Sequence, residues 1–337
     1  MIKKILRVSL VILLIVLVTA IALTFVYGNK IRTIASLKEI GKGSLYSMKY
    51  YGDYGFDKYL KKGVDLSKET SSDNQDERWA CSCFTATNEK GEHLFARNFD
   101  WMDDPALLLF TNPPRGYSSV STVDTLYVGF SNWNTPFAAS YKEKLGLLDT
   151  PTIPFDGMNE YGLAVGMNQI PDGDCNIDPS KVTIYSLEVM RLVLDHAKNV
   201  DEAVSLLGNY NVKFRQVNMH FIIADASGKS VIIEYVGGEM KVIKNEDAWQ
   251  VSTNFTIYGT KPEDRGFLCN RYATAYDTLK STNGVVKNDD SAMELLSNVK
   301  QYSTIWSVVY NMTTGDIQMA RNGNYDQVYK YRLQMKQ

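Results

Sequence analysis

The chain has 337 residues, of which 45% are hydrophobic and 22% are charged, and its formal net charge is −2. This composition suits a globular protein with a sizeable core, and a near-neutral body without a basic run argues against nucleic acid as a partner. The four cysteines are too few and too unevenly spaced for a disulfide scaffold. No CxxC or HExxH spacing occurs, so we expect neither a metal nor another cofactor.

The first element is an apolar run of uncharged residues from Val8 to Asn29, and it follows three basic residues, Lys3, Lys4 and Arg7. At ~1.5 Å per residue, a helix of this length can cross a ~30 Å hydrocarbon layer. Ala20-Ile21-Ala22 could serve as a signal-peptidase site, but the run continues through Tyr27, which favours an uncleaved anchor. Residues 1–29 are therefore predicted to be a membrane anchor or signal segment. The basic flank places the body outside the cytoplasm, at the cell membrane, or secreted if the segment is cleaved.

Residues 30–80 are predicted to be an aromatic pro-segment followed by a polar linker. Ser44 to Lys62 contains five tyrosines, which is too aromatic for a disordered spacer and indicates a segment docked on the body. Asp65 to Arg78 is almost wholly polar and is expected to be a solvent-exposed loop, where a chain can be cut without disturbing a core.

Residues 81–337 are predicted to form one large domain. The expected strands are Ser82–Asn88, His93–Phe99, Leu163–Asn168, His220–Asp225, Val231–Tyr235, Glu239–Lys244, Ile305–Asn311 and Ile317–Arg321. The expected helices are Ile184–Asn199, a helix capped by Asp201 and ending at Leu207, Arg271–Lys280 and Ser291–Val299. Mostly antiparallel strands with helix pairs between them predict an α+β protein in which helices cover stacked sheets.

Cys81 is the candidate nucleophile, sixteen residues before Arg97. A thiol of pKa ~8.5 attacks only as a thiolate and needs a base. The chain has three histidines, His93, His196 and His220, and a structural role suffices for each of them. An α-amino group titrates near ~7.7–8.0, so a cysteine that begins a mature chain carries its own base. This route requires a cut before Cys81.

The stretch from Cys81 to Trp101 resembles the opening of the linear amide C-N hydrolases, the N-terminal-nucleophile group that contains bile salt hydrolases, penicillin V acylases and acid ceramidase. Later blocks resemble further motifs of that family, in the same order: Asp156–Leu163 with Gly166–Asn168, Ser252–Asn254, and Asn270–Tyr272. The resemblance extends from about Cys81 to the C-terminus and implies the four-layer αββα sandwich of these enzymes. The long segment ahead of Cys81 departs from the bile salt hydrolases, in which the cysteine follows the initiator methionine.

The resemblance implies six catalytic residues: Cys81, Arg97, Asp100, Asn168, Asn254 and Arg271. Cys81 would attack the amide carbonyl, Arg97 would lower the pKa of its thiol, and Asp100 would orient the freed amine. The two asparagines would donate to the oxyanion, and Arg271 would complete the charge balance, with Arg265 as the alternative. Cys83 is expected on the same strand face as Cys81, where it could sense oxidation but is poorly placed for a disulfide.

The implied function is hydrolysis of a linear, non-peptide amide in a small-molecule acyl-amide substrate, after cleavage of the Ala80–Cys81 bond. The substrate pocket is expected in loops 102–122 and 130–148, with four aromatic candidates, Tyr117, Tyr127, Trp133 and Phe137. Two other interpretations are open. One is a surface protein of the same fold that binds amphipathic ligands without turnover, and the other is a cysteine peptidase that uses one of the histidines.

Overall fold

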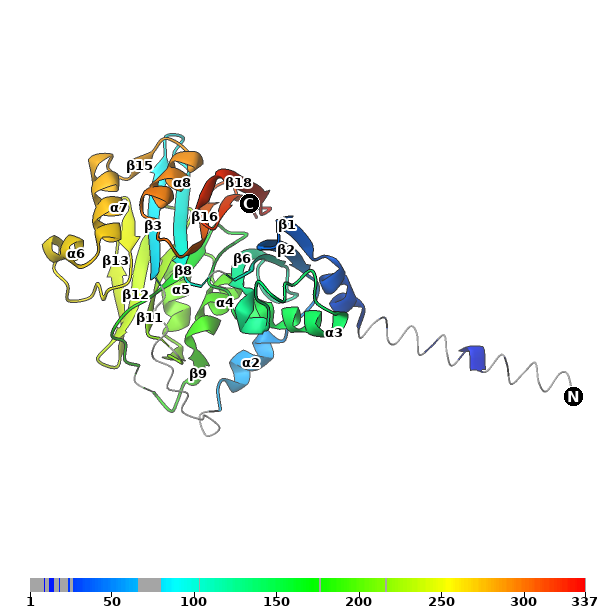
Figure 1. The fold of residues 1–337 in the computed structure, drawn as a ribbon. Coiled ribbons are helices and arrows are strands. Elements are labelled where there is room, and N and C mark those ends of the chain that lie inside the picture. The colour runs from blue at the N-terminus through cyan, green and yellow to red at the C-terminus, as the bar shows by residue number, and fades with distance from the viewer. Residues whose placement is uncertain are drawn as a thin grey trace, which may run out of the picture.

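The computed structural model describes residues 27–65, 80–102, 104–175, 177–215 and 217–336, together with residues 9, 12–14, 18 and 24. The described residues form two large sheets that lie against each other, with helices on both outer faces (Figure 1). The main hydrophobic core fills the space between the sheets and beneath the helices.

The first sheet has nine strands within the described residues. Their order is β1 (Lys38–Gly41), β2 (Leu45–Tyr50), β5 (Ala106–Thr111), β6 (Ser119–Asp124), β7 (Asp156–Asn159), β8 (Ala164–Gln169), β11 (Met219–Ala224), β12 (Ser230–Val236) and β13 (Glu239–Lys244). Neighbouring strands are antiparallel except β2 and β5, which are parallel. Helices α4 (Ser186–His196) and α5 (Val200–Leu207) pack on this sheet through β7, β8 and β11.

The second sheet contains the predicted nucleophile. Its order is β14 (Gln250–Ser252), β3 (Ala80–Asn88), β4 (His93–Asp100), β16 (Thr304–Asn311), β17 (Asp316–Arg321) and β18 (Asn324–Arg332), and β15 (Val285–Val286) also pairs with β3. Helices α7 (Asn270–Ser281) and α8 (Asp289–Asn298) cover it, and β3 contacts β8 of the first sheet. The layers are therefore helix, sheet, sheet, helix, as the resemblance implies.

The remaining elements are short. They are α2 (Phe56–Lys62), α3 (Tyr141–Lys144), α6 (Pro262–Leu268), the 3₁₀ turns η2 (Thr125–Val128) and η3 (Leu145–Thr152), and the parallel pair β9 (Val182–Tyr185) and β10 (Tyr210–Lys213). Ile184 was predicted to begin a helix, but it belongs to β9, so α4 begins only at Ser186. The predicted cap of α5 was wrong, since the Asn199 side chain, not that of Asp201, accepts the N–H of Glu202.

Most predicted strands and helices of the body are confirmed within a few residues of their predicted ends. The sequence prediction missed the hairpin of β5 and β6, which occupies most of the expected pocket loop 102–122. The segment ALLLFT is buried on both sides: Leu108 lies in the main core, whereas Leu107 and Leu109 lie in a second, smaller cluster. A strand buried on both faces lacks the apolar–polar alternation that marks an exposed one. Strand β18 was also missed, so the predicted final hairpin is part of a three-strand meander.

The segment ahead of Cys81 is built into the first sheet. Strand β2 pairs with β5 along its whole length, from Leu45 opposite Ala106 to Tyr50 opposite Thr111. Leu45 and Phe56 contribute to the main core, and the hydroxyl of Tyr54 donates to Asp195 Oδ2 at 2.6 Å. The predicted docking of this aromatic segment thus takes the form of paired strands and a helix.

Most of the apolar run from Val8 to Asn29 lies outside the described residues, as does most of the polar stretch from Asp65 to Arg78. Among the residues that are described, no helix is both long enough and apolar enough to cross a membrane.

Candidate active site

The β3–β4 hairpin brings Cys81 and Arg97 together. Cys81 lies opposite Phe99, and Cys83 lies opposite Arg97, in the antiparallel register of the two strands. Cys81 and Cys83 share a face because they are two residues apart on one strand. Arg97 Nη2 donates to Cys81 Sγ across 3.5 Å, and all three side chains are fully buried. Both cysteines are free thiols.

Arg97 is held by the opposite sheet. Its Nη1 lies 2.7 Å from Asp156 Oδ2 in β7, and its Nη2 donates to the Met167 carbonyl of β8 at 2.7 Å. Asp156 also accepts from Trp306 Nε1 at 2.9 Å and from the Tyr310 hydroxyl at 2.6 Å. A buried ion pair is tolerable when its remaining polar atoms are also bonded, and among the described residues only Nε of Arg97 has no partner in this pair. The other contacts fix the guanidinium beside the sulfur. Sequence analysis missed the role of Asp156, although it opens the second family-like block.

The backbone of Cys81 is held on its other side by Asn254 and Arg271. Cys81 N–H donates to Asn254 Oδ1 at 2.7 Å. Arg271, the second residue of α7, donates to the Cys81 carbonyl, to Ser82 Oγ at 3.0 Å and to Asn254 Oδ1 at 2.8 Å. Arg265 instead donates to the Thr260 carbonyl at 3.3 Å. Of the two arginines, the structure therefore places Arg271 at the predicted site.

Asp100 closes the site at the end of β4. It lies opposite Ala80 in the strand register, so it is next to the bond that precedes Cys81. Thr304 Oγ1 donates to Asp100 Oδ1 at 2.6 Å, and Arg271 Nη1 lies 3.7 Å from Oδ2. In the described part of the chain, Oδ2 accepts no hydrogen bond. Burial raises the pKa of Asp100 to about 6, although Thr304, Arg271 and Arg97 act in the opposite direction.

The amides of Asn168 and Asn254 are engaged with the protein. Asn168 Nδ2 donates to Ser252 Oγ at 2.8 Å, and its Oδ1 accepts from the Cys83 thiol at 3.1 Å. Asn254 Nδ2 donates to the Gln169 carbonyl at 2.9 Å. The structure brings both side chains to the surroundings of Cys81, and their role as oxyanion donors stays a prediction.

Two opposed effects act on the pKa of the Cys81 thiol. Burial raises the pKa of the thiol, and the neighbouring Arg97 and Arg271 guanidiniums lower it. The raised pKa means that, in the uncut chain, the thiol is protonated at neutral pH. A base must be supplied before the sulfur can attack.

The sequence model of the linear amide C-N hydrolases, choloylglycine hydrolase family, matches residues 81–262, more than half of the chain, and its match begins at Cys81. The chain belongs to this family. A penicillin V acylase of Pectobacterium atrosepticum is 29% identical over 175 residues, which cover 48% of this chain and 45% of that protein. The chain thus spans less than half the length of the curated relatives that it matches.

Two solved structures share the fold of this family member. A penicillin V acylase from Agrobacterium tumefaciens has a TM-score of 0.54 at 18% identity, covering 75% of this chain and 86% of that one. A mutant of the conjugated bile acid hydrolase from Clostridium perfringens also has a TM-score of 0.54, at 14% identity, covering 75% and 92%. These likenesses support the N-terminal-nucleophile hydrolase fold for the body.

The three histidines have other partners than Cys81. His93 shares a hydrogen bond with Thr87 Oγ1, His196 lies 3.2 Å from Asp57 Oδ1, and His220 Nδ1 lies 2.8 Å from Glu234 Oε1. Within the described residues, no histidine hydrogen-bonds to Cys81. A cysteine–histidine pair therefore has no structural support in this member of the family.

One hollow adjoins the site, and a second lies beyond a series of aromatic rings. The first, of about 610 Å³, is lined by Trp101, Met102, Tyr302, Ser303, Thr304, Ile305 and Asn322, next to Asp100. The other, of about 190 Å³, has Tyr127 in its wall, and the rings of Tyr127, Phe155 and Phe99 form a continuous series toward Cys81. The other aromatic pocket candidates lie elsewhere: Tyr117 packs on Tyr161, and Trp133 and Phe137 are exposed.

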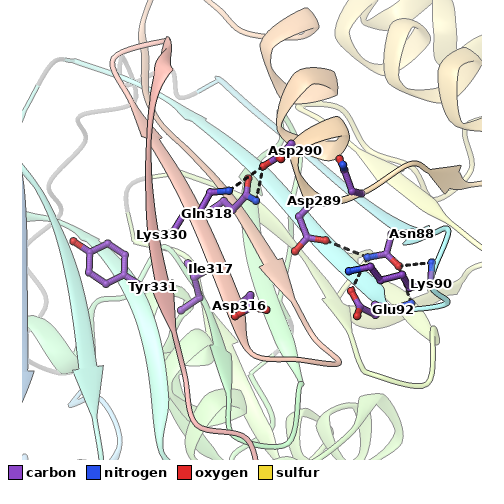
Figure 2. A pocket seen from close by; sticks show the side chains of 11 residues that line it. Asn88, Lys90, Glu92, Asp289, Asp290, Asp316, Ile317, Gln318, Lys330 and Tyr331 are labelled. Atoms are coloured by element: carbon purple, nitrogen blue, oxygen red, sulfur yellow. Dashed lines mark hydrogen bonds and ion pairs between the residues drawn. The ribbon is translucent and has the colours of Figure 1, made fainter.

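A third hollow, of about 350 Å³, lies at the far end of β3, around the turn from Asn88 to Glu92 (Figure 2). Its polar groups bond mainly to one another: Asn88 donates to Glu92 and Asp289, and Gln318 donates to Asp290. Among the described residues, no three histidine, cysteine or acidic side chains are placed to hold a metal ion. This hollow takes no part in the site around Cys81.

Proposed function

We propose that this chain hydrolyses a linear, non-peptide amide, with Cys81 as an N-terminal nucleophile that is exposed by cleavage of the Ala80–Cys81 bond. The observation that carries the proposal is the position of Cys81, whose sulfur contacts Arg97 while its backbone N–H lies 2.7 Å from Asn254 Oδ1. A cut at this bond turns that N–H into an amine beside its own thiol. The base that the site lacks in the uncut chain is then present.

The reaction would proceed in two halves. The free amine takes the thiol proton, and the sulfur attacks the amide carbonyl to form a tetrahedral oxyanion, which amide N–H groups at the site stabilise. The protonated amine then gives its proton to the leaving nitrogen, the carbon–nitrogen bond breaks, and an acyl-cysteine remains. In the second half, the amine accepts a proton from water, the hydroxide attacks the thioester, and the thiolate leaves and is reprotonated.

The surrounding charges suit this cycle. Arg97 stabilises the thiolate, and Asp156 prevents the guanidinium from being an uncompensated buried charge. Asp100 Oδ2 is available to accept from the new amine, and Arg271 fixes the Cys81 carbonyl. These contacts and those of Asn254 support Cys81, Arg97, Asp100, Asn254 and Arg271 as one group, and Asn168 adjoins it through its bond to the Cys83 thiol.

The same proposal includes the place of the enzyme in the cell. The apolar run from Val8 to Asn29 and its basic flank support a single membrane anchor with an extracytoplasmic catalytic domain. The buried pairing of β2 with β5 would keep the anchor-bearing piece attached after cleavage.

Intact mass, N-terminal sequencing and amide hydrolysis by the full chain test this function, beside Cys81→Ala and Cys83→Ala. We expect wild type and Cys83→Ala to yield a fragment beginning at residue 81 and to release amine from a panel of N-acyl amines and amino-acid conjugates. Cys81→Ala should stay uncut and inactive. An uncut wild type would remove the base from the mechanism, and a cut wild type that binds the panel without releasing product would identify a ligand-binding protein.

A further inference from the structure

Three exposed aromatic residues lie in the segment 130–148, four residues apart along the chain. Trp133 is 99% exposed, Phe137 is 54% exposed and Tyr141 is 53% exposed, so these three residues, here called the aromatic patch, present large apolar surfaces to the surroundings. Exposed apolar surface of this kind marks a site of interaction with a protein or a membrane. The site around Cys81 does not use it.

The aromatic patch belongs to a folded segment. Phe130 is buried ahead of Trp133, Ala139 is buried between Phe137 and Tyr141, and Leu147 is buried beyond α3. Between them, Ser131 and Asn134 form a bridge, and Lys144 Nζ both donates to the Phe137 carbonyl at 2.9 Å and lies 5.7 Å from the centre of its ring. The side chains are therefore exposed by a folded segment.

The aromatic patch is beside the place where the N-terminal run leaves the body. Ile34 and Leu37, at the end of helical residues 27–35, pack in one buried cluster with Phe130, Ala139 and Leu147. In Figure 1, α3 accordingly lies next to the dark-blue start of the folded body. An anchor that begins at this point would bring the same face to a membrane.

Two unbalanced basic residues lie in the helical residues 27–35, which pack beside the segment that bears the aromatic patch. Residues 27–35 carry Lys30 and Arg32, and residues 140–149 carry Lys142 and Lys144 against Glu143 and Asp149. Glu143 and Asp149 balance Lys142 and Lys144, so the net positive charge near the aromatic patch comes from Lys30 and Arg32. Tryptophan and tyrosine favour the membrane–water boundary, and lysine and arginine favour anionic headgroups.

We propose that the aromatic patch and its neighbouring basic residues dock the catalytic body on the surface of the membrane that holds its anchor. The inference rests on the proposed anchor and adds a second, peripheral contact to it. The contact fixes which face of the enzyme lies on lipid and leaves the opposite side of the molecule, with α6 and α7, facing away (Figure 1).

Tryptophan quenching by brominated lipids tests this contact. The full chain is reconstituted in phosphatidylcholine–phosphatidylglycerol vesicles with or without brominated acyl chains, and Trp133→Phe is compared with Trp249→Phe, which removes a buried tryptophan packed on Tyr276. We expect bromine to quench a fraction of the emission of Trp249→Phe that is at least as large as in wild type, and a fraction at least twofold smaller in Trp133→Phe. The double change Trp133→Phe with Phe137→Trp should recover the quenching.

The outcomes separate the patch from the anchor. Flotation with the vesicles but equal quenching in wild type and Trp133→Phe would overturn the lipid contact and leave the anchor standing. Failure to float would overturn the anchor and the docking with it, whereas the hydrolysis proposal is judged by the fragment beginning at Cys81. Cleavage and circular dichroism of each variant establish that it is folded.

Discussion

Arg97 joins Cys81 to Asp156: one nitrogen of its guanidinium lies 3.5 Å from the sulfur, and the other lies 2.7 Å from the carboxylate. Cys81 belongs to the second sheet and Asp156 to the first, so the arginine spans the space between them. The charge that can stabilise a thiolate is thus also part of what holds the two sheets together.

Asp156→Asn should destabilise the fold strongly. It leaves a fully buried guanidinium without its counter-charge, which costs about 3–5 kcal/mol in other proteins. The measurement is urea unfolding of the variant in the Cys81→Ala background, so that cleavage does not intervene. Asp201→Asn, which breaks the exposed pair with Lys229, is the matched control and should change the unfolding midpoint far less. Equal shifts of the unfolding midpoint in the two variants would show that the ion pair between the sheets contributes no more to stability than the exposed pair.

Asp100 should make the uncut chain less stable as pH rises. Its pKa is raised from 3.8 to about 6, so the folded state holds a proton that the unfolded state releases between these values. Stability from this group is present below pH ~4 and is lost by pH ~6, and a shift of this size corresponds to about 3 kcal/mol. Asp100→Asn in the Cys81→Ala background should gain about that much relative to its parent between pH ~4 and pH ~7. If the difference in unfolding free energy between Asp100→Asn and its parent does not change with pH, the raised pKa of Asp100 is contradicted.

Cys83→Ala should separate positioning from nucleophilic attack. The variant loses the thiol that donates to Asn168 Oδ1 and leaves this buried oxygen without that donor. We expect cleavage at Cys81 to persist and kcat to fall about fivefold with KM nearly unchanged, in keeping with about 1 kcal/mol for one neutral hydrogen bond. Steady-state kinetics on the best amide of the panel measures the changes in kcat and KM separately. Loss of cleavage in Cys83→Ala, with a folded spectrum, would assign Cys83 a larger part than this.

The two cleavage products should remain together. β2 contributes Leu45, Tyr46 and Met48 to buried clusters, and Tyr54 bonds to Asp195. Native size-exclusion chromatography in detergent should show one species that contains both fragments, and denaturant should separate them. Release of the N-terminal fragment under native conditions would mean that the β2–β5 pairing alone does not hold it.

Exchange of any single histidine should leave amide hydrolysis in place. His93→Gln and His196→Gln affect partly exposed side chains that bond to groups other than Cys81, and activity within about twofold of wild type is expected. His220→Asn disturbs the buried contact with Glu234, so its activity is to be corrected for the folded fraction. Complete loss of activity in one folded variant would favour a cysteine peptidase.

Local patterns in the sequence were enough to predict the strands and helices that have strong signals. The β3–β4 hairpin follows from two apolar segments around Lys90-Gly91. The register observed in the structure then places Arg97 opposite Cys83 and next to Cys81. The family-like blocks likewise indicated which distant residues would meet around Cys81.

Other contacts arise only when the layers assemble. Asp156 pairs with Arg97 because the two sheets stack. Arg271 reaches the carbonyl of Cys81 because α7 packs against β3, whereas Arg265 bonds to the Thr260 carbonyl. Residues 102–122 form a hairpin and not a pocket loop because both faces of β5 find apolar partners, one of them in the segment ahead of Cys81. Burial on both sides is a property of the assembled layers, so periodicity in one segment could not reveal it.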